Sequence, residues 1–265
     1  MLSKNWTGRV RESMKSDQPW LILSPHLDDA ILSCGALLQA EVGHREIVVA
    51  TVFTESTPPP HTHAAKTFLR QCSAIDADAL FAERRDEDRQ VLSELGVKSV
   101  HLGCADALFR RRSGFSRQLT SAGKVLPELV HRYPTYRFDI ARGRVSKGDN
   151  ELATALHRQV QELIDQTDAE LIFSPIGVGR HVDHLITRTV GAAFPEQVVY
   201  YSDFPYDQHH AADAQFIYRH GLTPMTWDED VSAKAKLIRG YGTQADALFT
   251  DGNIPVAPEI YYAAS

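Results

Sequence analysis

A histidine and two aspartates, His26, Asp28 and Asp29, stand between two apolar segments in the stretch LILSPHLDDAILSCG at residues 21–35. Charged groups are costly to remove from water unless they are paired or bind a metal. Imidazole and carboxylate suit zinc and similar divalent ions, and a neighbouring uncoordinated carboxylate can take a proton from the metal-bound water. The stretch therefore predicts a divalent metal site. A second interpretation stays open, in which an aspartate only caps a helix and His26 only bonds to a backbone carbonyl.

A similar cluster occurs downstream, in the stretch SPIGVGRHVDHLIT at residues 174–187. His181 and His184 are three residues apart, so they share one face of a helix if the segment is helical. Asp183 lies beside them and could fix the tautomer of an imidazole, as the outer carboxylates of metal sites do. An H-x-x-H pattern alone is weak evidence, but two such clusters with complementary ligands indicate one shared site.

A catalytic zinc ion typically keeps three protein ligands and one open position for water or substrate. His26, Asp29 and His184 would supply two nitrogens and one carboxylate. This choice leaves Asp28 and His181 for proton transfer and charge stabilisation.

The clusters require elements that bring them together, and apolar segments alternate with helix-like segments along the chain. The expected strands are residues 20–24, 46–53, 99–103, 169–175 and 197–204, and the expected helices are residues 30–42, 83–96, 150–166, 182–194 and 232–249. This alternation predicts a Rossmann-like α/β fold, a mostly parallel sheet with helices on both faces. Both clusters follow expected strands, and ligands of such sheets bind at the carboxyl ends of the strands.

We expect one domain over residues 1–265, because no internal repeat interrupts the alternation. Two long polar segments break it, a proline-rich loop at 54–66 and a variable insertion at about 107–150, and long loops are often functional. His61 or His63 in the first loop could contact a substrate. The basic run at 110–112 could grip an anionic group, although a solvated surface is the favoured interpretation.

Composition excludes several function classes. With 34 acidic and 28 basic residues and a net charge of -6, the chain gives no electrostatic reason to bind nucleic acid or an anionic membrane. No segment approaches the roughly 18 apolar residues of a membrane span, and the first residues lack a signal-peptide core. Three widely spaced cysteines argue against a disulfide framework. We therefore expect a cytoplasmic protein with a small-molecule substrate, and self-association stays open.

The two clusters resemble the LmbE-like deacetylases, the family that includes the PIG-L-type N-acetylglucosaminyl-phosphatidylinositol de-N-acetylases. The family pattern is His-Pro-Asp-Asp near the N-terminus and His-x-Asp-His downstream, and this chain has HLDD at 26–29 and HVDH at 181–184. Arg84 and Asp106 also match family positions. Leu27 stands where the family usually has proline, which leaves the ligand residues intact.

The resemblance implies a zinc-dependent hydrolase, or one using another divalent metal, that removes an N-acetyl group from an N-acetylglucosamine-type molecule and releases acetate. The implied roles are metal binding by His26, Asp29 and His184, general base catalysis by Asp28, stabilisation or protonation of the tetrahedral intermediate by His181, orientation of an imidazole by Asp183, and sugar binding by Arg84 and Asp106.

Two other functions stay open. The same ligands could serve a metal-dependent amidohydrolase that acts on a thiol conjugate or a natural-product precursor. The same sheet could also belong to a non-catalytic Rossmann-like binding protein, because fold does not determine function. No G-x-G-x-x-G motif follows the first expected strand, which disfavours dinucleotide binding.

Overall fold

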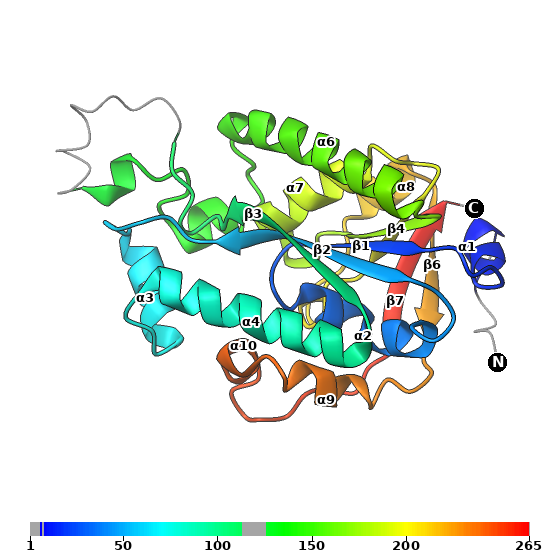
Figure 1. Cartoon of the computed structure of the whole chain (residues 1–265). Coiled ribbons are helices and arrows are strands. Elements are labelled where there is room, and N and C mark those ends of the chain that lie inside the picture. The colour runs from blue at the N-terminus through cyan, green and yellow to red at the C-terminus, as the bar shows by residue number, and fades with distance from the viewer. Residues whose placement is uncertain (1–5, 7, 113–125, 265) are drawn as a thin grey trace.

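The computed structural model describes Trp6 and residues 8–112 and 126–264, in which a seven-stranded sheet lies between two layers of helices (Figure 1). The strand order is β3-β2-β1-β4-β5-β7-β6. The strands are β1 (Trp20–Ser24), β2 (Ile47–Glu55), β3 (Lys98–Ala105), β4 (Leu171–Pro175), β5 (Val198–Tyr201), β6 (Leu222–Trp227) and β7 (Glu259–Ala264).

The five strands from β3 to β5 are mutually parallel, whereas β7 is antiparallel to both of its neighbours. The central strand β1 pairs with β2 on one side and with β4 on the other. Its five residues are all buried, as expected for a strand covered on both faces. The carboxyl ends of β1 and β4 therefore lie side by side.

Helices cover both faces of the sheet (Figure 1). One face carries α6 (Asn150–Thr167) and α7 (Val182–Gly191), and the other carries α2 (Asp29–Glu41), α4 (Ala77–Leu95), α9 (Lys234–Ile238) and α10 (Gly242–Leu248). The remaining helices are α1 (Gly8–Ser13), α3 (His63–Gln71) and α8 (Ala214–Arg219), with single turns η1 (Pro127–Leu129), η2 (Tyr136–Ile140), η3 (Lys147–Asp149), η4 (Val178–Arg180) and η5 (Tyr206–Gln208).

Side chains of β1 alternate between the two cores. Trp20 and Ile22 pack in the core that contains residues of α2 and α4, whereas Leu21 and Leu23 pack in the core that contains residues of α6 and α7. Alternation with period two is the geometry of a strand. These two cores hold the sheet rigid beneath the loops at its carboxyl edge.

The expected fold class, a mostly parallel sheet with helices on both faces, is confirmed. That the whole chain forms one domain stays a prediction. The described residues contain no helix with the length and apolar character required to cross a bilayer.

Some expected elements differ from the observed ones. The single helix expected at 232–249 is wrong, because it is divided into α9 and α10. At the break, a Cβ on Gly240 would lie 2.4 Å from a methyl group of Val91, so the chain passes close to α4 there. The proline-rich segment at 54–66 includes the start of α3, which Thr62 caps by accepting a hydrogen bond from the amide of Ala65.

The strands β6 and β7 have no counterpart among the expected elements. Pro224 lies within β6, and a proline argues against a central strand. The residue is tolerated because β6 is the edge strand of the sheet.

Candidate metal centre and active site

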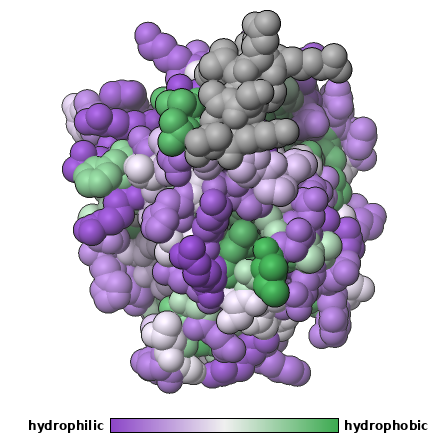
Figure 2. Space-filling model, turned by 90° about the vertical axis from the view of Figure 1, so that its left-hand side faces the viewer, coloured by the Kyte–Doolittle hydropathy of each residue, from purple (hydrophilic) through white to green (hydrophobic). Residues whose placement is uncertain are grey.

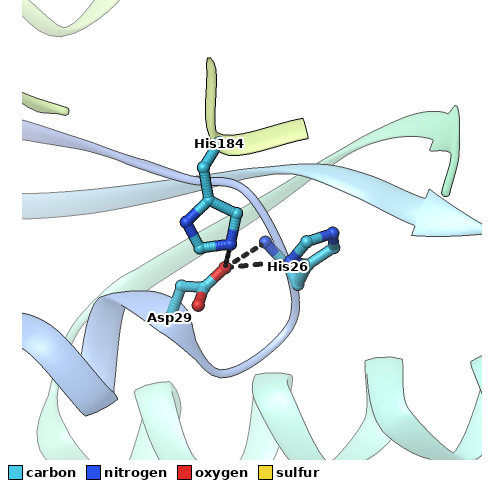
Figure 3. A group of neighbouring side chains, drawn as sticks. All are labelled: His26, Asp29 and His184. Carbon is cyan, nitrogen blue, oxygen red and sulfur yellow. Dashed lines mark hydrogen bonds and ion pairs between the residues drawn. The ribbon is translucent and has the colours of Figure 1, made fainter. Parts of the chain in front are cut away.

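The two clusters meet at the carboxyl edge of the sheet (Figure 3). His26 follows β1, Asp29 begins α2, and His184 lies in the first turn of α7. The Asp29 Oδ2 atom lies 3.1 Å from His26 Nδ1 and 3.3 Å from His184 Nε2. The potential ligand atoms of these residues all lie within 4.8 Å of one another. The structure thus brings together the three residues expected to hold a metal.

A buried carboxylate, Asp203, orients His184. The His184 Nδ1 atom lies 2.6 Å from Asp203 Oδ1, and Asp203 Oδ2 accepts hydrogen bonds from the amides of Gly177 and Val178. Gly177 has a φ of 82°, and a Cβ there would lie 2.7 Å from Leu185, so the turn requires glycine. Asp203 is not among the residues expected from the sequence, because it falls within the strand expected at 197–204. The strand β5 ends at Tyr201, so Asp203 follows it at the same edge of the sheet as the first cluster.

The second ring nitrogen of His26 faces two other carboxylates. His26 Nε2 lies 3.4 Å from Asp183 Oδ2 and 3.4 Å from Asp106 Oδ2. Asp183 is fully buried, and its Oδ2 also accepts a hydrogen bond from the amide of Ala107. Each of the two imidazoles therefore has a carboxylate at the nitrogen that points away from Asp29, the arrangement by which metal sites fix a histidine tautomer.

The centre contains more buried carboxyl groups than buried arginine and lysine side chains. Five carboxylates around it, those of Asp28, Asp29, Asp106, Asp183 and Asp203, are each at least nine-tenths buried. Among the described arginines and lysines, Arg110 alone forms an ion pair with any of them. Buried charges require a partner, so this donor set fits a bound cation.

The charges of the centre shift its pKa values. Burial disfavours the ionised form of Asp29. The charge of His184 and the hydrogen bond from His26 outweigh burial and lower the pKa of Asp29. Burial likewise opposes the charged form of His26, yet hydrogen bonds to Asp183 and Asp29 raise its pKa well above the usual value. The surroundings of the centre thus favour the ionised form of Asp29 and the protonated form of His26.

Asp28 belongs to neither group of possible metal ligands, whereas His181 forms a second such group with His26 and Asp183. Asp28 occupies the N-cap position of α2, but its carboxylate makes no capping hydrogen bond, nor any other with a described residue, so the interpretation of an aspartate that only caps the helix is wrong for Asp28. Burial, together with the charge of Asp29, raises the pKa of Asp28 to about 7. His181 Nδ1 accepts a hydrogen bond from the amide of Asp183, which places the ring hydrogen on Nε2, and burial lowers its pKa well below the usual value.

Arg110 connects the centre to the segment at 126–149. It pairs with Asp183 and donates to Asp149 over 3.0 Å, and Asp149 also accepts hydrogen bonds from Arg132 and Tyr133. The solvated-surface interpretation of the run at 110–112 is therefore wrong for Arg110, which is 6% exposed.

Replacing Arg110 with methionine should lower the free energy of unfolding by about 3–5 kcal/mol, because Asp183 would keep a buried charge without its cation. Denaturant unfolding followed by circular dichroism measures the change. Arg89→Met is the matched control, because its ion pair with Asp86 is exposed and should contribute under about 1 kcal/mol. Equal stability of the two variants would contradict the expectation.

A cavity of about 860 Å³ opens over the centre. His26, Asp28, Asp29 and His181 lie at its base, and Arg84 and Asp106, the two residues expected to hold a sugar, also line it. Both long segments contribute to its wall, the first through α3 and the second through residues 134–138. His63 lines the cavity, whereas the ring of His61 packs edge-on against Phe109. The part of the insertion at 113–125 lies outside the described residues.

Solved structures of two deacetylases share the fold. The zinc-inhibited form of the teicoplanin deacetylase Orf2 superposes with a TM-score of 0.72 at 23% identity, covering 92% of this chain and 97% of that one. The A40926 pseudoaglycone deacetylase Dbv21 gives a TM-score of 0.66 at 23% identity, covering 94% and 97%.

Two curated relatives match nearly the whole chain. The 2'-N-acetylparomamine deacetylase of Streptomyces fradiae is 29% identical over 249 residues, which cover 89% of this chain and 77% of that protein. The protein of the same name from Niallia circulans is 24% identical over 270 residues, covering 92% and 90%.

The family model described as PIG-L, GlcNAc-PI de-N-acetylase, matches residues 21–195, which is more than half of the chain. The matched segment contains both clusters, from His26 to His184, and confirms the resemblance drawn from them. The chain therefore belongs to the PIG-L de-N-acetylase family.

Proposed function

We propose that this protein is a metal-dependent hydrolase that removes an N-acetyl group from a sugar-type substrate and releases acetate. The observation that carries the proposal is the convergence of His26, Asp29 and His184 beside an uncommitted Asp28 at the base of a large cavity. The family match and the deacetylase relatives confirm the reaction class expected from the sequence, hydrolytic de-N-acetylation.

His26 Nδ1, Asp29 Oδ2 and His184 Nε2 would hold the ion. Zinc fits this donor set, because catalytic zinc takes nitrogen and carboxylate ligands and leaves a position open. When bound, such an ion polarises an amide carbonyl and makes a nearby water molecule more acidic.

Asp28 would act as the general base. Its carboxylate is uncommitted and lines the cavity, so it can accept a proton from the attacking water and return it to the leaving amine. His181 would donate its Nε2 hydrogen to the carbonyl oxygen as negative charge develops there. One well-placed donor of this kind contributes about 2.7–4 kcal/mol to stabilising the transition state.

Asp183 and Asp203 would orient the two imidazoles, His26 and His184 respectively. Arg84 and Asp106 would hold the sugar, because both line the cavity near Asp28 and His26.

Replacing Asp203 with asparagine should weaken metal binding by about 10–100-fold, the usual effect of losing the carboxylate that orients a ligand histidine. Competition with a chelating dye measures the affinity. Asp207→Asn is the control, because Asp207 lies on the same loop and its side chain bonds only to Gln208 among the described residues. Unchanged affinity in Asp203→Asn would rule out the orienting role.

Acetate release from a panel of N-acetylglucosamine derivatives tests the proposed reaction. We expect acetate and the free amine in equal amounts. A panel from which the metal-loaded protein releases no acetate would rule the function out.

A further inference from the structure

The cavity has an apolar side that the acetamide reaction does not use. Six side chains form it, and we call this surface the apolar annex: Leu27, Leu32, Phe68, Phe81, Ala247 and Leu248. They come from the loop after β1 and from α2, α3, α4 and α10. We infer that the substrate carries a bulky apolar group beside its N-acetylated sugar, and that the annex binds this group. This inference rests on the proposed function.

The annex lies next to the reacting centre. The Arg84 guanidinium lies 5.1 Å from the ring of Phe68 and 6.0 Å from that of Phe81. Arg84 and Asp28 line the same cavity, and Leu27 of the annex directly precedes Asp28 in the chain. Arg84 therefore marks the boundary between the annex and the centre, so a group attached to a sugar at Asp28 would reach the annex directly.

Away from the centre, the described lining of the cavity offers few carboxylates to a substrate with several positive charges. Beyond the centre and Asp106, the described lining has one carboxylate, Glu128, which already accepts a hydrogen bond from the amide of His63. Arg84 and Arg137 also line the cavity and would repel a polyamine.

The size of the cavity supports an occupant larger than one sugar ring. A volume of about 860 Å³ lies toward the upper end of the roughly 300–1,000 Å³ typical of pockets that bury drug-sized ligands. Phe138 lines the cavity and is 61% exposed, so an aromatic side chain stands at its mouth. Figure 2 views the molecule from the carboxyl ends of the parallel strands and shows hydrophobic side chains near the centre of this face, surrounded by hydrophilic ones.

A series of alkyl 2-acetamido-2-deoxyglucosides, from methyl through butyl to octyl, tests the inference below the concentrations at which micelles form. We expect kcat/KM for acetate release to rise about fourfold for each of the first added methylenes, the effect of burying a CH₂ group. A flat series would overturn the inference, as would a higher kcat/KM for 2'-N-acetylparomamine than for the octyl glucoside.

Variants locate the apolar site. Phe68→Gln should lower the octyl-to-methyl ratio of kcat/KM by about tenfold, because it places a polar group in the annex. Ile75→Gln is the control, because Ile75 is fully exposed and does not line the cavity, so its ratio should equal that of the unmodified protein. A ratio that is equal in Phe68→Gln and Ile75→Gln would place the apolar site elsewhere and overturn the assignment.

Binding without turnover separates this inference from the proposed function. Calorimetric titration of metal-loaded Asp28→Asn protein with the octyl and methyl glucosides measures binding directly. Tighter binding of the octyl compound, with no acetate released by the unmodified protein from any substrate, would support the annex and overturn the function. Equal binding of both compounds, with acetate released, would support the function and overturn the annex.

Discussion

Asp28→Asn protein is expected to keep its metal and to lose about 10²–10⁴-fold in kcat for acetate release, the usual contribution of general acid–base catalysis. The amide has nearly the shape of the carboxylate but cannot accept a proton. Asp28 is not one of the three clustered residues, so its replacement leaves the ligand set intact. Steady-state kinetics and elemental analysis of the same purified sample measure the two quantities.

Asp246→Asn is the control for this prediction, because Asp246 is exposed on α10. We expect it to behave as the unmodified protein. A loss in kcat of about threefold or less would be much smaller than the contribution of proton transfer. Such a result for Asp28→Asn would show that Asp28 is not the base. If it lost the metal, Asp28 would be a ligand instead.

His184→Ala protein is expected to lose both the metal and the acetate-releasing activity. The substitution removes one of the three ligand atoms, and the remaining pair, His26 and Asp29, falls short of the three protein ligands of a catalytic zinc site. Elemental analysis after dialysis and chelator competition measure the loss.

His184→Ala leaves Asp203 without its imidazole partner and could therefore unfold the protein. A second substitution separates the loss of a metal ligand from the loss of the fold. His184→Gln keeps a hydrogen-bond donor for Asp203 and should also fail to retain metal while remaining folded by circular dichroism. His209→Ala, at an exposed position, is the control. Retention of one ion per chain by folded His184→Gln would exclude His184 as a ligand.

The sequence was sufficient to predict that His26 and Asp29 lie at the same edge of the sheet as His184, because these residues follow the rules of parallel sheets. The segment at 20–24 is apolar except for Ser24, which indicates a buried strand with His26 at its carboxyl end. His184 follows β4 by the same rule. That β1 and β4 are neighbours, which lets Asp29 meet His184, is a property of the sheet order that local patterns do not contain.

Contacts between distant segments account for what the sequence did not reveal. Arg110 is buried because Asp149, 39 positions later, and Asp183 surround its guanidinium, and the run of arginines alone is typical of a solvated surface. Asp203 could be placed on His184 only once β4 and β5 were known to pair. The break near Gly240 likewise depends on the approach of Val91 from α4.

Titration of the metal-free protein with Zn²⁺, with acetate release from an N-acetylglucosaminide followed at each addition, tests the central claim most directly. We expect acetate release to be absent without metal, to rise until one ion is bound per chain, and to disappear when a chelator is added. Equal acetate release by the metal-free and the metal-loaded protein would contradict a hydrolase built on His26, Asp29 and His184.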